Sequence, residues 1–140
     1  MTAEARVVRT EAVDCAARTQ VLIVGGGATG LCAALAARDA GADALVVERD
    51  RQPMGTTAMS TGLIPAAGSR VQRAHGIADS PDSFARDMSA KAKGRVDMAL
   101  VTRLAEESAA TVDWLVEAHG VALSLVEGFR YPGHSALRMH

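Results

Sequence analysis

The sequence predicts an α/β fold that begins with a β–α–β unit, and three observations in residues 21–48 support this prediction. The apolar run at residues 21–24 stops at a glycine cluster, as a buried parallel strand does before a tight turn. An alanine-rich segment follows and ends at Gly41, which is typical of a helix with a glycine at its C-terminus. A second apolar run at residues 44–47 then ends in Glu48. Strand, turn, helix and strand therefore follow one another at compatible spacings.

The glycine cluster fits the G-x-G-x-x-G pattern of a Rossmann-like dinucleotide-binding turn through Gly25, Gly27 and Gly30. Gly25 permits the turn, Gly27 lets a pyrophosphate approach the backbone, and Gly30 lets the helix pack closely on the strand. We expect the N–H groups of the first helical turn, at Ala28 and Thr29, to face the phosphates. The pattern therefore predicts dinucleotide binding.

Glu48 lies about 20 residues beyond the glycines, which is where an acid binds the ribose hydroxyls in such units. Its carboxylate would repel a 2′-phosphate, so NADP is the poorest candidate ligand. Arg49 follows directly and could offset that charge, although an arginine at a strand end is more often simply solvated. On this unit alone, FAD and NAD are both possible ligands.

Composition points to one globular domain of ordinary size, because the 140 residues are 49% hydrophobic and 22% charged. The formal net charge of −1 gives no electrostatic reason to expect nucleic acid as a partner. No apolar run approaches the ~20 residues of a membrane-spanning helix. Residues 1–19 lack the apolar region of a secretory signal, and we expect them to form a flexible tail.

The cysteines and histidines suggest no metal or redox chemistry. Cys15 and Cys32 do not form a C-x-x-C pair, and this usage fits a cytoplasmic protein. We expect Cys32 to be a small buried apolar residue. No metal site is expected, because the histidines have no recognised ligand spacing; they are His75, His119, His134 and His140.

Two helices are predicted after a loop at residues 53–69 that is rich in glycine and proline. Ser80, followed by a proline, is typical of a helix start, and this helix should run to about Lys93. Asp97 should cap a second helix that ends near Gly120. The apolar face of the second helix is expected to comprise Val101, Leu104, Ala105, Ser108, Val112, Leu115 and Val116.

Residues 121–126 favour a short strand, and residues 129–140 are loop-like. A doubly wound sheet needs more strands than the two or three candidates found here. The sequence therefore predicts an incomplete doubly wound sheet, as in the front portion of a larger protein.

The loop after the second strand helps to choose between FAD and NAD. In an NAD-binding domain this strand would lead quickly into another crossover helix, whereas here residues 55–68 are rich in hydroxyls and glycine. Such a loop suits a larger cofactor, because hydroxyls and backbone N–H groups can bond a pyrophosphate or the polar edge of an isoalloxazine ring. A plain surface loop is the alternative. The candidate cofactor-binding residues in this loop are Thr56, Thr57, Ser60, Thr61 and Gly62.

From residue 20 onward the chain resembles the N-terminal part of the fumarate reductase/succinate dehydrogenase flavoprotein family, which includes L-aspartate oxidases and 3-ketosteroid dehydrogenases. Met54 and Leu63 replace glycines of the family pattern, and Pro65 replaces its asparagine. The pattern G-G-N-S-x-x-S-G-G-x-x-N-A-A-G is matched at Gly55, Thr57, Ser60, Gly62, Ala66, Ala67 and Gly68. The resemblance implies that residues 20–140 form the N-terminal part of an FAD-binding domain and stop at the start of a substrate-capping domain.

The resemblance also implies an FAD-dependent oxidoreductase that transfers a hydride across a C–C bond of a small molecule, either a dicarboxylate or a ketosteroid. Thr56 stands where the respiratory complexes carry a histidine joined to FAD, so the FAD is expected to be non-covalent. The family's catalytic residues lie beyond residue 140, and we expect the 140 residues alone to be inactive. The alternatives are a non-catalytic truncated fragment and an NAD-dependent dehydrogenase.

Arg138 and His140 could help to form a pocket for an anionic substrate, because a guanidinium binds carboxylates through a paired fork. We favour the simpler interpretation that both are solvated or hydrogen-bond to the capping domain. Ser135 has no convincing histidine or aspartate partner nearby in the sequence, so no nucleophilic triad is expected.

Overall fold

The computed structural model describes residues 17–53 and 55–140. Most of the predicted tail, together with Cys15 and Met54, therefore lies outside the described residues. The chain forms two compact units, Met1–Ser60 and Thr61–His140. We refer to them as the N-terminal unit and the C-terminal unit.

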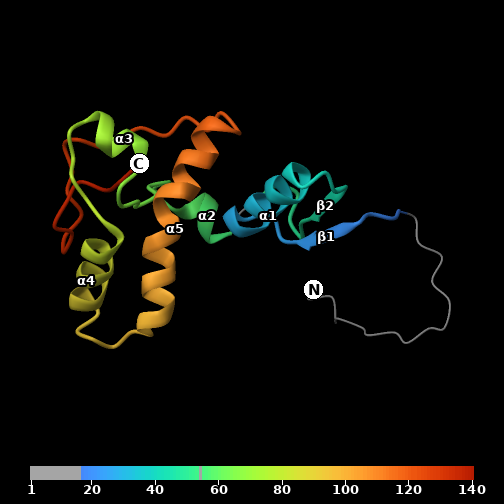
Figure 1. Ribbon diagram of the computed structural model, residues 1–140. Coiled ribbons are helices and arrows are strands. Elements are labelled where there is room, and N and C mark those ends of the chain that lie inside the picture. The colour runs from blue at the N-terminus through green and yellow to red at the C-terminus, as the bar shows by residue number, and fades with distance from the viewer. Residues whose placement is uncertain (1–16, 54) are drawn as a thin grey trace. The chain divides into compact units, whose positions relative to one another are not determined.

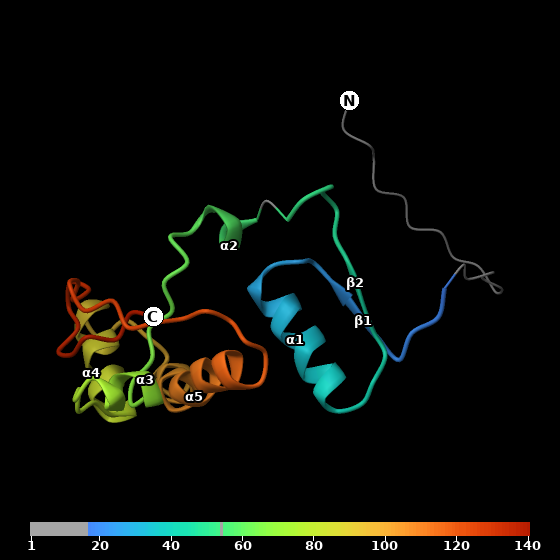
Figure 2. The same ribbon diagram turned by 90° about the horizontal axis from the view of Figure 1, so that it is seen from above.

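The N-terminal unit contains a parallel β–α–β arrangement, which confirms the first sequence prediction (Figure 2). Strand β1 (Val21–Val24) pairs in parallel with strand β2 (Ala44–Val47), and helix α1 (Ala28–Asp39) connects them. Among the described residues the sheet has these two strands only. One face of the sheet is half-buried and the other is exposed, with Val24 at 83% exposure. An incomplete doubly wound sheet would present such an open apolar face, because parallel sheets are normally covered on both sides.

Helix α1 ends as the sequence predicts. Gly41 has a φ of +76°, which a residue with a side chain rarely adopts. Its N–H donates to the carbonyl of Arg38, and the N–H of Ala42 donates to the carbonyl of Ala37. These two bonds form a Schellman motif, which satisfies the last carbonyls of the helix and turns the chain toward β2.

The loop prediction for residues 53–69 is wrong for one turn, because helix α2 (Thr56–Met59) forms within it. The turn begins after Gly55, whose carbonyl accepts a hydrogen bond from the N–H of Met59. The glycine and proline residues that predict a loop flank this turn rather than interrupt it.

The C-terminal unit is helical, and α4 (Pro81–Lys91) packs beside α5 (Met98–Glu117) (Figure 1). The short helix α3 (Arg70–Ala74) precedes them. Both predicted N-caps are present, since Ser80 accepts a hydrogen bond from the N–H of Ser83 and the carboxylate of Asp97 accepts one from Ala99. Each of the two long helices ends slightly before its predicted end. The core between them comprises Ala67, Phe84, Ala85 and Ala105, with Met88 and Val101 packed against it.

The predicted apolar face of α5 is only partly correct. Ala105, Val112 and Leu115 are buried as expected, whereas Leu104 is 49% exposed. The predicted face is wide, and Leu104 lies at its edge by helical spacing.

The strand predicted at residues 121–126 does not form. The N–H of Val121 donates to the carbonyl of Leu115 at the end of α5, and the N–H of Leu123 donates to the carbonyl of Val121. A single bond crosses to the C-terminal segment, from the N–H of Val126 to the carbonyl of Met139. The segment is apolar enough for a strand, but none of the described residues forms a strand beside it, so its backbone bonds are mostly local.

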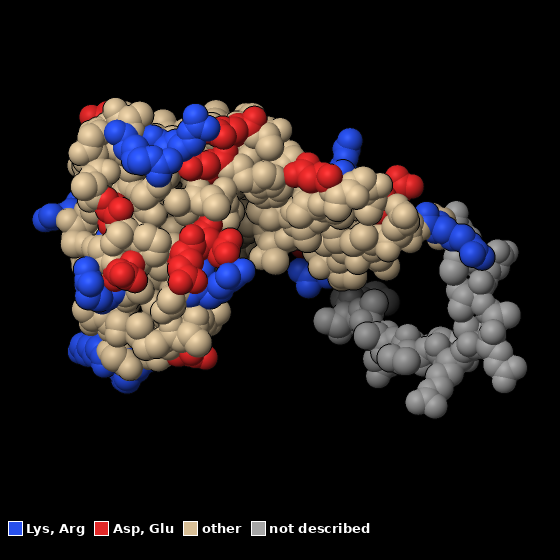
Figure 3. Space-filling view, viewed as in Figure 1, with Lys and Arg blue, Asp and Glu red and all other residues tan. Residues whose placement is uncertain are grey.

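Acidic and basic side chains are intermixed on the visible face of the C-terminal unit (Figure 3). No helix in the described part of the chain is both long and apolar enough to cross a membrane.

Candidate cofactor-binding site

The glycine turn after β1 lies close to the end of β2. The N–H of Gly25 donates to the carbonyl of Val47 at 2.8 Å, and its φ of +107° lets the chain reverse into α1. A Cβ placed on Gly30 would lie 2.0 Å from the carbonyl oxygen of Gly25 and 3.2 Å from a side-chain carbon of Ile23. The structure therefore confirms that α1 packs so closely on the turn that only glycine fits at position 30.

The N-terminus of α1 is suited to an anion. Its N-cap is Gly27, which offers no capping side chain, and no acidic residue lies in the first turn. The N–H of Ala28 donates to the Thr57 hydroxyl of α2 at 3.1 Å. This bond is therefore accepted by a neutral side chain outside α1. The positive end of the helix dipole is left without a carboxylate of its own.

Glu48 is held beside the glycine turn by two backbone groups. One carboxylate oxygen accepts a hydrogen bond from the N–H of Gly26 at 2.7 Å, and the other accepts one from the N–H of Asp50 at 3.2 Å. These bonds, first that from Gly26 and then that from Asp50, lower the pKa of Glu48. The carboxylate is therefore ionised at neutral pH and fixed in position. Sequence reasoning placed an acid here but missed its bond to the turn, which no spacing rule indicates.

The remaining predicted residues of this unit divide between the two helix starts and the surface. Thr29 lies in the first turn of α1, and Thr56 begins α2. Ser60 donates its hydroxyl hydrogen to the carbonyl of Thr57 at 2.9 Å. Arg49 is 89% exposed and forms an ion pair with Asp50 at 3.2 Å, which raises its pKa. The positive charge of Arg49 is thus paired with the carboxylate of Asp50.

The structure therefore brings together part of the predicted site, and it places Thr61 and Gly62 in the C-terminal unit. The residues gathered around the turn are Gly25, Gly27, Ala28, Gly30, Glu48 and Thr57. Within residues 17–53 and 55–140, no three His, Cys, Asp or Glu side chains gather as a metal site requires.

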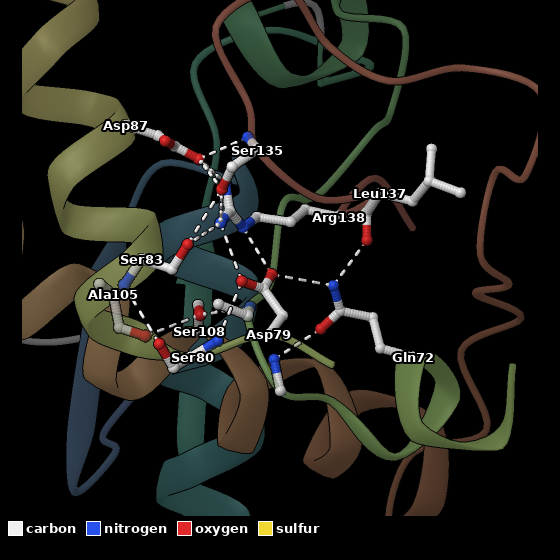
Figure 4. A network of polar contacts seen from close by, with 12 residues as sticks. Gln72, Asp79, Ser80, Ser83, Asp87, Ala105, Ser108, Ser135, Leu137 and Arg138 are labelled. Carbon is white, nitrogen blue, oxygen red and sulfur yellow. Dashed lines mark hydrogen bonds and ion pairs between the residues drawn. The ribbon is translucent and has the colours of Figure 1, made fainter. Parts of the chain in front are cut away.

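In the C-terminal unit, Arg138 is fully buried in an ion-pair network (Figure 4). Its Nε and Nη2 donate to the two carboxylate oxygens of Asp79 at 2.6 and 2.8 Å, and its Nη1 donates to Asp87 at 2.5 Å. The interpretation of Arg138 as a solvated residue is therefore wrong. Two carboxylates already occupy its guanidinium, so it is not available to an anionic substrate.

Asp87 titrates at unusually low pH as a result. Burial raises its pKa, but the hydrogen bonds from Arg138 and from the N–H and hydroxyl of Ser135 outweigh burial and lower the pKa to about 2. The hydroxyl of Ser135 also contacts Ser83 at 2.9 Å and Arg138 at 3.2 Å. These partners include an aspartate that sequence reasoning did not find, but none is a histidine base that a triad would need.

His140 is also buried, so the interpretation of this residue as solvated is wrong as well. Its Nε2 lies 2.7 Å from the hydroxyl of Ser69, and its Nδ1 lies 3.3 Å from the carbonyl of Ile64. Both partners belong to the segment between α2 and α3. The imidazole therefore fastens the C-terminal segment to that part of the same unit.

Comparison with known proteins identifies the fold to which this site belongs. A probable fumarate reductase of Shewanella frigidimarina is 41% identical over 97 residues, which cover 69% of this chain and 16% of the relative. The open conformation of a flavocytochrome c3 fumarate reductase superposes with a TM-score of 0.74 at 37% identity, covering 87% of this chain and 21% of that one. A 3-ketosteroid dehydrogenase of Rhodococcus jostii, solved with 4-androstene-3,17-dione, superposes with a TM-score of 0.63 at 35% identity. This match covers 71% of this chain and 21% of that one.

The chain thus spans about a fifth of the length of the proteins it matches. These similarities confirm the resemblance to the fumarate reductase/succinate dehydrogenase flavoproteins and support a Rossmann-like α/β fold for the described residues. The pattern of the FAD binding domain family matches residues 20–138, which include the glycine turn, Glu48 and the loop that follows it. The chain therefore belongs to the FAD binding domain family.

Proposed function

We propose that the full-length protein is an FAD-dependent oxidoreductase that transfers a hydride and a proton across a C–C bond of a small molecule. The fit of the glycine turn to a dinucleotide supports the cofactor, and the similarity to a fumarate reductase and a 3-ketosteroid dehydrogenase supports the reaction. The turn leaves no room for a side chain at Gly30, and the start of α1 has neither a capping side chain of its own nor an acid in its first turn. Both features suit a pyrophosphate group.

The residues around the turn would hold the adenosine diphosphate half of FAD. We assign Gly25, Gly27 and Gly30 to the pyrophosphate and Glu48 to the adenosine ribose. Each carboxylate oxygen of Glu48 accepts one backbone hydrogen bond and keeps a second lone pair, which can accept a bond from a ribose hydroxyl. The bonds to the backbone orient the carboxylate before any ligand binds.

We assign residues 56–62 to the part of the site nearer the flavin. Thr57 can serve two groups at once, because its hydroxyl oxygen accepts the N–H of Ala28 while its hydrogen is available to a phosphate oxygen. FAD, when bound, supplies the hydride chemistry. The chain's own residues bind it, orient it and neutralise its phosphates with backbone dipoles.

The first expected result is that FAD is released intact when the purified full-length protein is denatured in acid. Thr56 begins α2 with a hydroxyl where the respiratory complexes have a histidine, so no imidazole is present there to form a bond to the flavin. The measurement is the visible spectrum of the supernatant after precipitation. A fluorescent protein band on a denaturing gel would show covalent attachment and contradict this prediction.

The second expected result concerns the reaction class. Under anaerobic conditions the chemically reduced protein should recover its oxidised flavin spectrum when an activated alkene is added. Fumarate and 4-androstene-3,17-dione represent the two substrate classes, dicarboxylates and ketosteroids, and a saturated analogue of each serves as the control. If no member of either class reoxidises the flavin, the proposed reaction is wrong.

A further inference from the structure

A cavity in the C-terminal unit is lined by residues other than Arg138 and its partners Asp79 and Asp87. Its volume of about 550 Å³ falls within the range of small-ligand sites. One of its residues, Thr61, also belongs to the predicted cofactor-binding loop. The cavity is lined by Thr61, Leu63, Pro65, Phe129, Tyr131, His134 and Met139.

The walls of the cavity are mainly apolar and aromatic. The rings of Phe129 and Tyr131 meet edge to face with centroids 6.1 Å apart, and the rings of Tyr131 and His134 are 5.2 Å apart. Phe129 and Tyr131 are nevertheless 41% and 39% exposed. Aromatic rings that gather at a hollow and remain exposed are typical of a binding site rather than of a core.

Among the described residues that line the cavity, none is a lysine or an arginine. Burial, and then the charge of Arg138, lower the pKa of His134, so its imidazole is neutral at neutral pH. Arg138 itself is occupied by Asp79 and Asp87. The ammonium of Lys91 lies 4.0 Å from the centre of the Tyr131 ring and donates to the carbonyl of Pro132 at 2.8 Å.

The cavity does offer neutral polar groups. Thr61 and Tyr131 carry hydroxyls, which can donate or accept a hydrogen bond. These groups suit a ketone or a hydroxyl and not an ion.

We propose that this cavity binds a flat, apolar ring ketone, and that the substrate belongs to this class rather than to the dicarboxylates. The inference rests on the proposed function and narrows its substrate class. The aromatic walls would cover the ring system, and one neutral polar group of the cavity would bond the ketone.

Equilibrium dialysis of the full-length protein against 4-androstene-3,17-dione, with fumarate in a parallel arm, tests this proposal. We expect the steroid to bind and fumarate to bind at least about tenfold more weakly. Phe129→Ala removes an aromatic wall and should weaken steroid binding about tenfold or more. Tyr131→Ala should do the same, and because both side chains are partly exposed, both variants should fold. The matched control is Leu100→Ala, which removes an apolar side chain that is 66% exposed and does not line the cavity.

Tighter binding of fumarate than of the steroid would overturn the inference. Equal steroid binding by the Phe129, Tyr131 and Leu100 variants would also overturn it. A visible spectrum recorded on each sample separates this test from that of the proposed function. A sample without flavin contradicts the proposed function, whereas the dialysis result still decides what the cavity binds.

Discussion

Replacing Gly30 by alanine is expected to weaken FAD binding by roughly 10- to 100-fold. The added methyl group would lie 2.0 Å from the carbonyl oxygen of Gly25, so α1 must move away from the turn. Overpacking of this kind costs about 1–3 kcal/mol. The free protein can relax by shifting α1, but the bound state needs the start of α1 at the pyrophosphate, so the strain weakens binding. Titration of the full-length apoprotein with FAD, followed by flavin fluorescence, measures the effect.

Gly128→Ala is the matched control, because a Cβ at Gly128 would meet no atom within 4 Å. The same methyl group is added there without a clash, and FAD affinity should stay within about twofold of the unmodified protein. If Gly30→Ala binds FAD as tightly as Gly128→Ala, then α1 does not hold the cofactor in the way proposed here.

The β–α–β unit can be predicted from the sequence because its signals are local. Apolar runs fix the two strands at Val21–Val24 and Ala44–Val47, and glycines mark both ends of the connecting helix. Each signal acts within a few residues of the element it determines. The same holds for the caps of the later helices at Ser80 and Asp97.

The strand predicted at residues 121–126 fails for the opposite reason. Strand propensity describes how well a residue fits a sheet, and a sheet needs a neighbouring strand. The backbone of this segment bonds to the end of α5, to itself and, through one bond, to Met139, and Leu125 is buried without forming a strand. Local composition could not show which partner would be present.

The contacts that organise the candidate site join distant parts of the chain. The carboxylate of Glu48 accepts a hydrogen bond from the N–H of Gly26, which lies 22 positions earlier in the sequence. The hydroxyl of Thr57 accepts one from the N–H of Ala28, which lies 29 positions earlier. The spacing rule that identifies Glu48 concerns the ribose, and it contains no information about the turn. Such bonds depend on how the loops close, which a single sequence does not determine.

The burial of Arg138 is difficult to predict from the sequence. An arginine is almost never fully buried unless it is paired, so solvent exposure is the natural expectation. Its partners Asp79 and Asp87 lie 59 and 51 positions away, before and within α4. They meet the guanidinium only because the C-terminal segment folds back along that helix (Figure 4).

Replacing Arg138 by methionine is expected to destabilise the C-terminal unit by about 3–5 kcal/mol. The side chains of Arg138 and Asp79 are 0% and 1% exposed, so the variant would leave a buried carboxylate without its partner. Arg103→Met is the matched control, because it breaks an ion pair with Glu107 whose side chains are 72% and 52% exposed, and such pairs contribute less than about 1 kcal/mol. Amide hydrogen exchange of α4 in the full-length protein measures both effects locally.

Adding Asp79→Asn to Arg138→Met should recover part of the lost stability, since it removes an unpaired buried charge. If the amides of α4 exchanged no faster in Arg138→Met than in Arg103→Met, but Arg138→Met lost affinity for fumarate, then Arg138 would bind substrate rather than stabilise the fold.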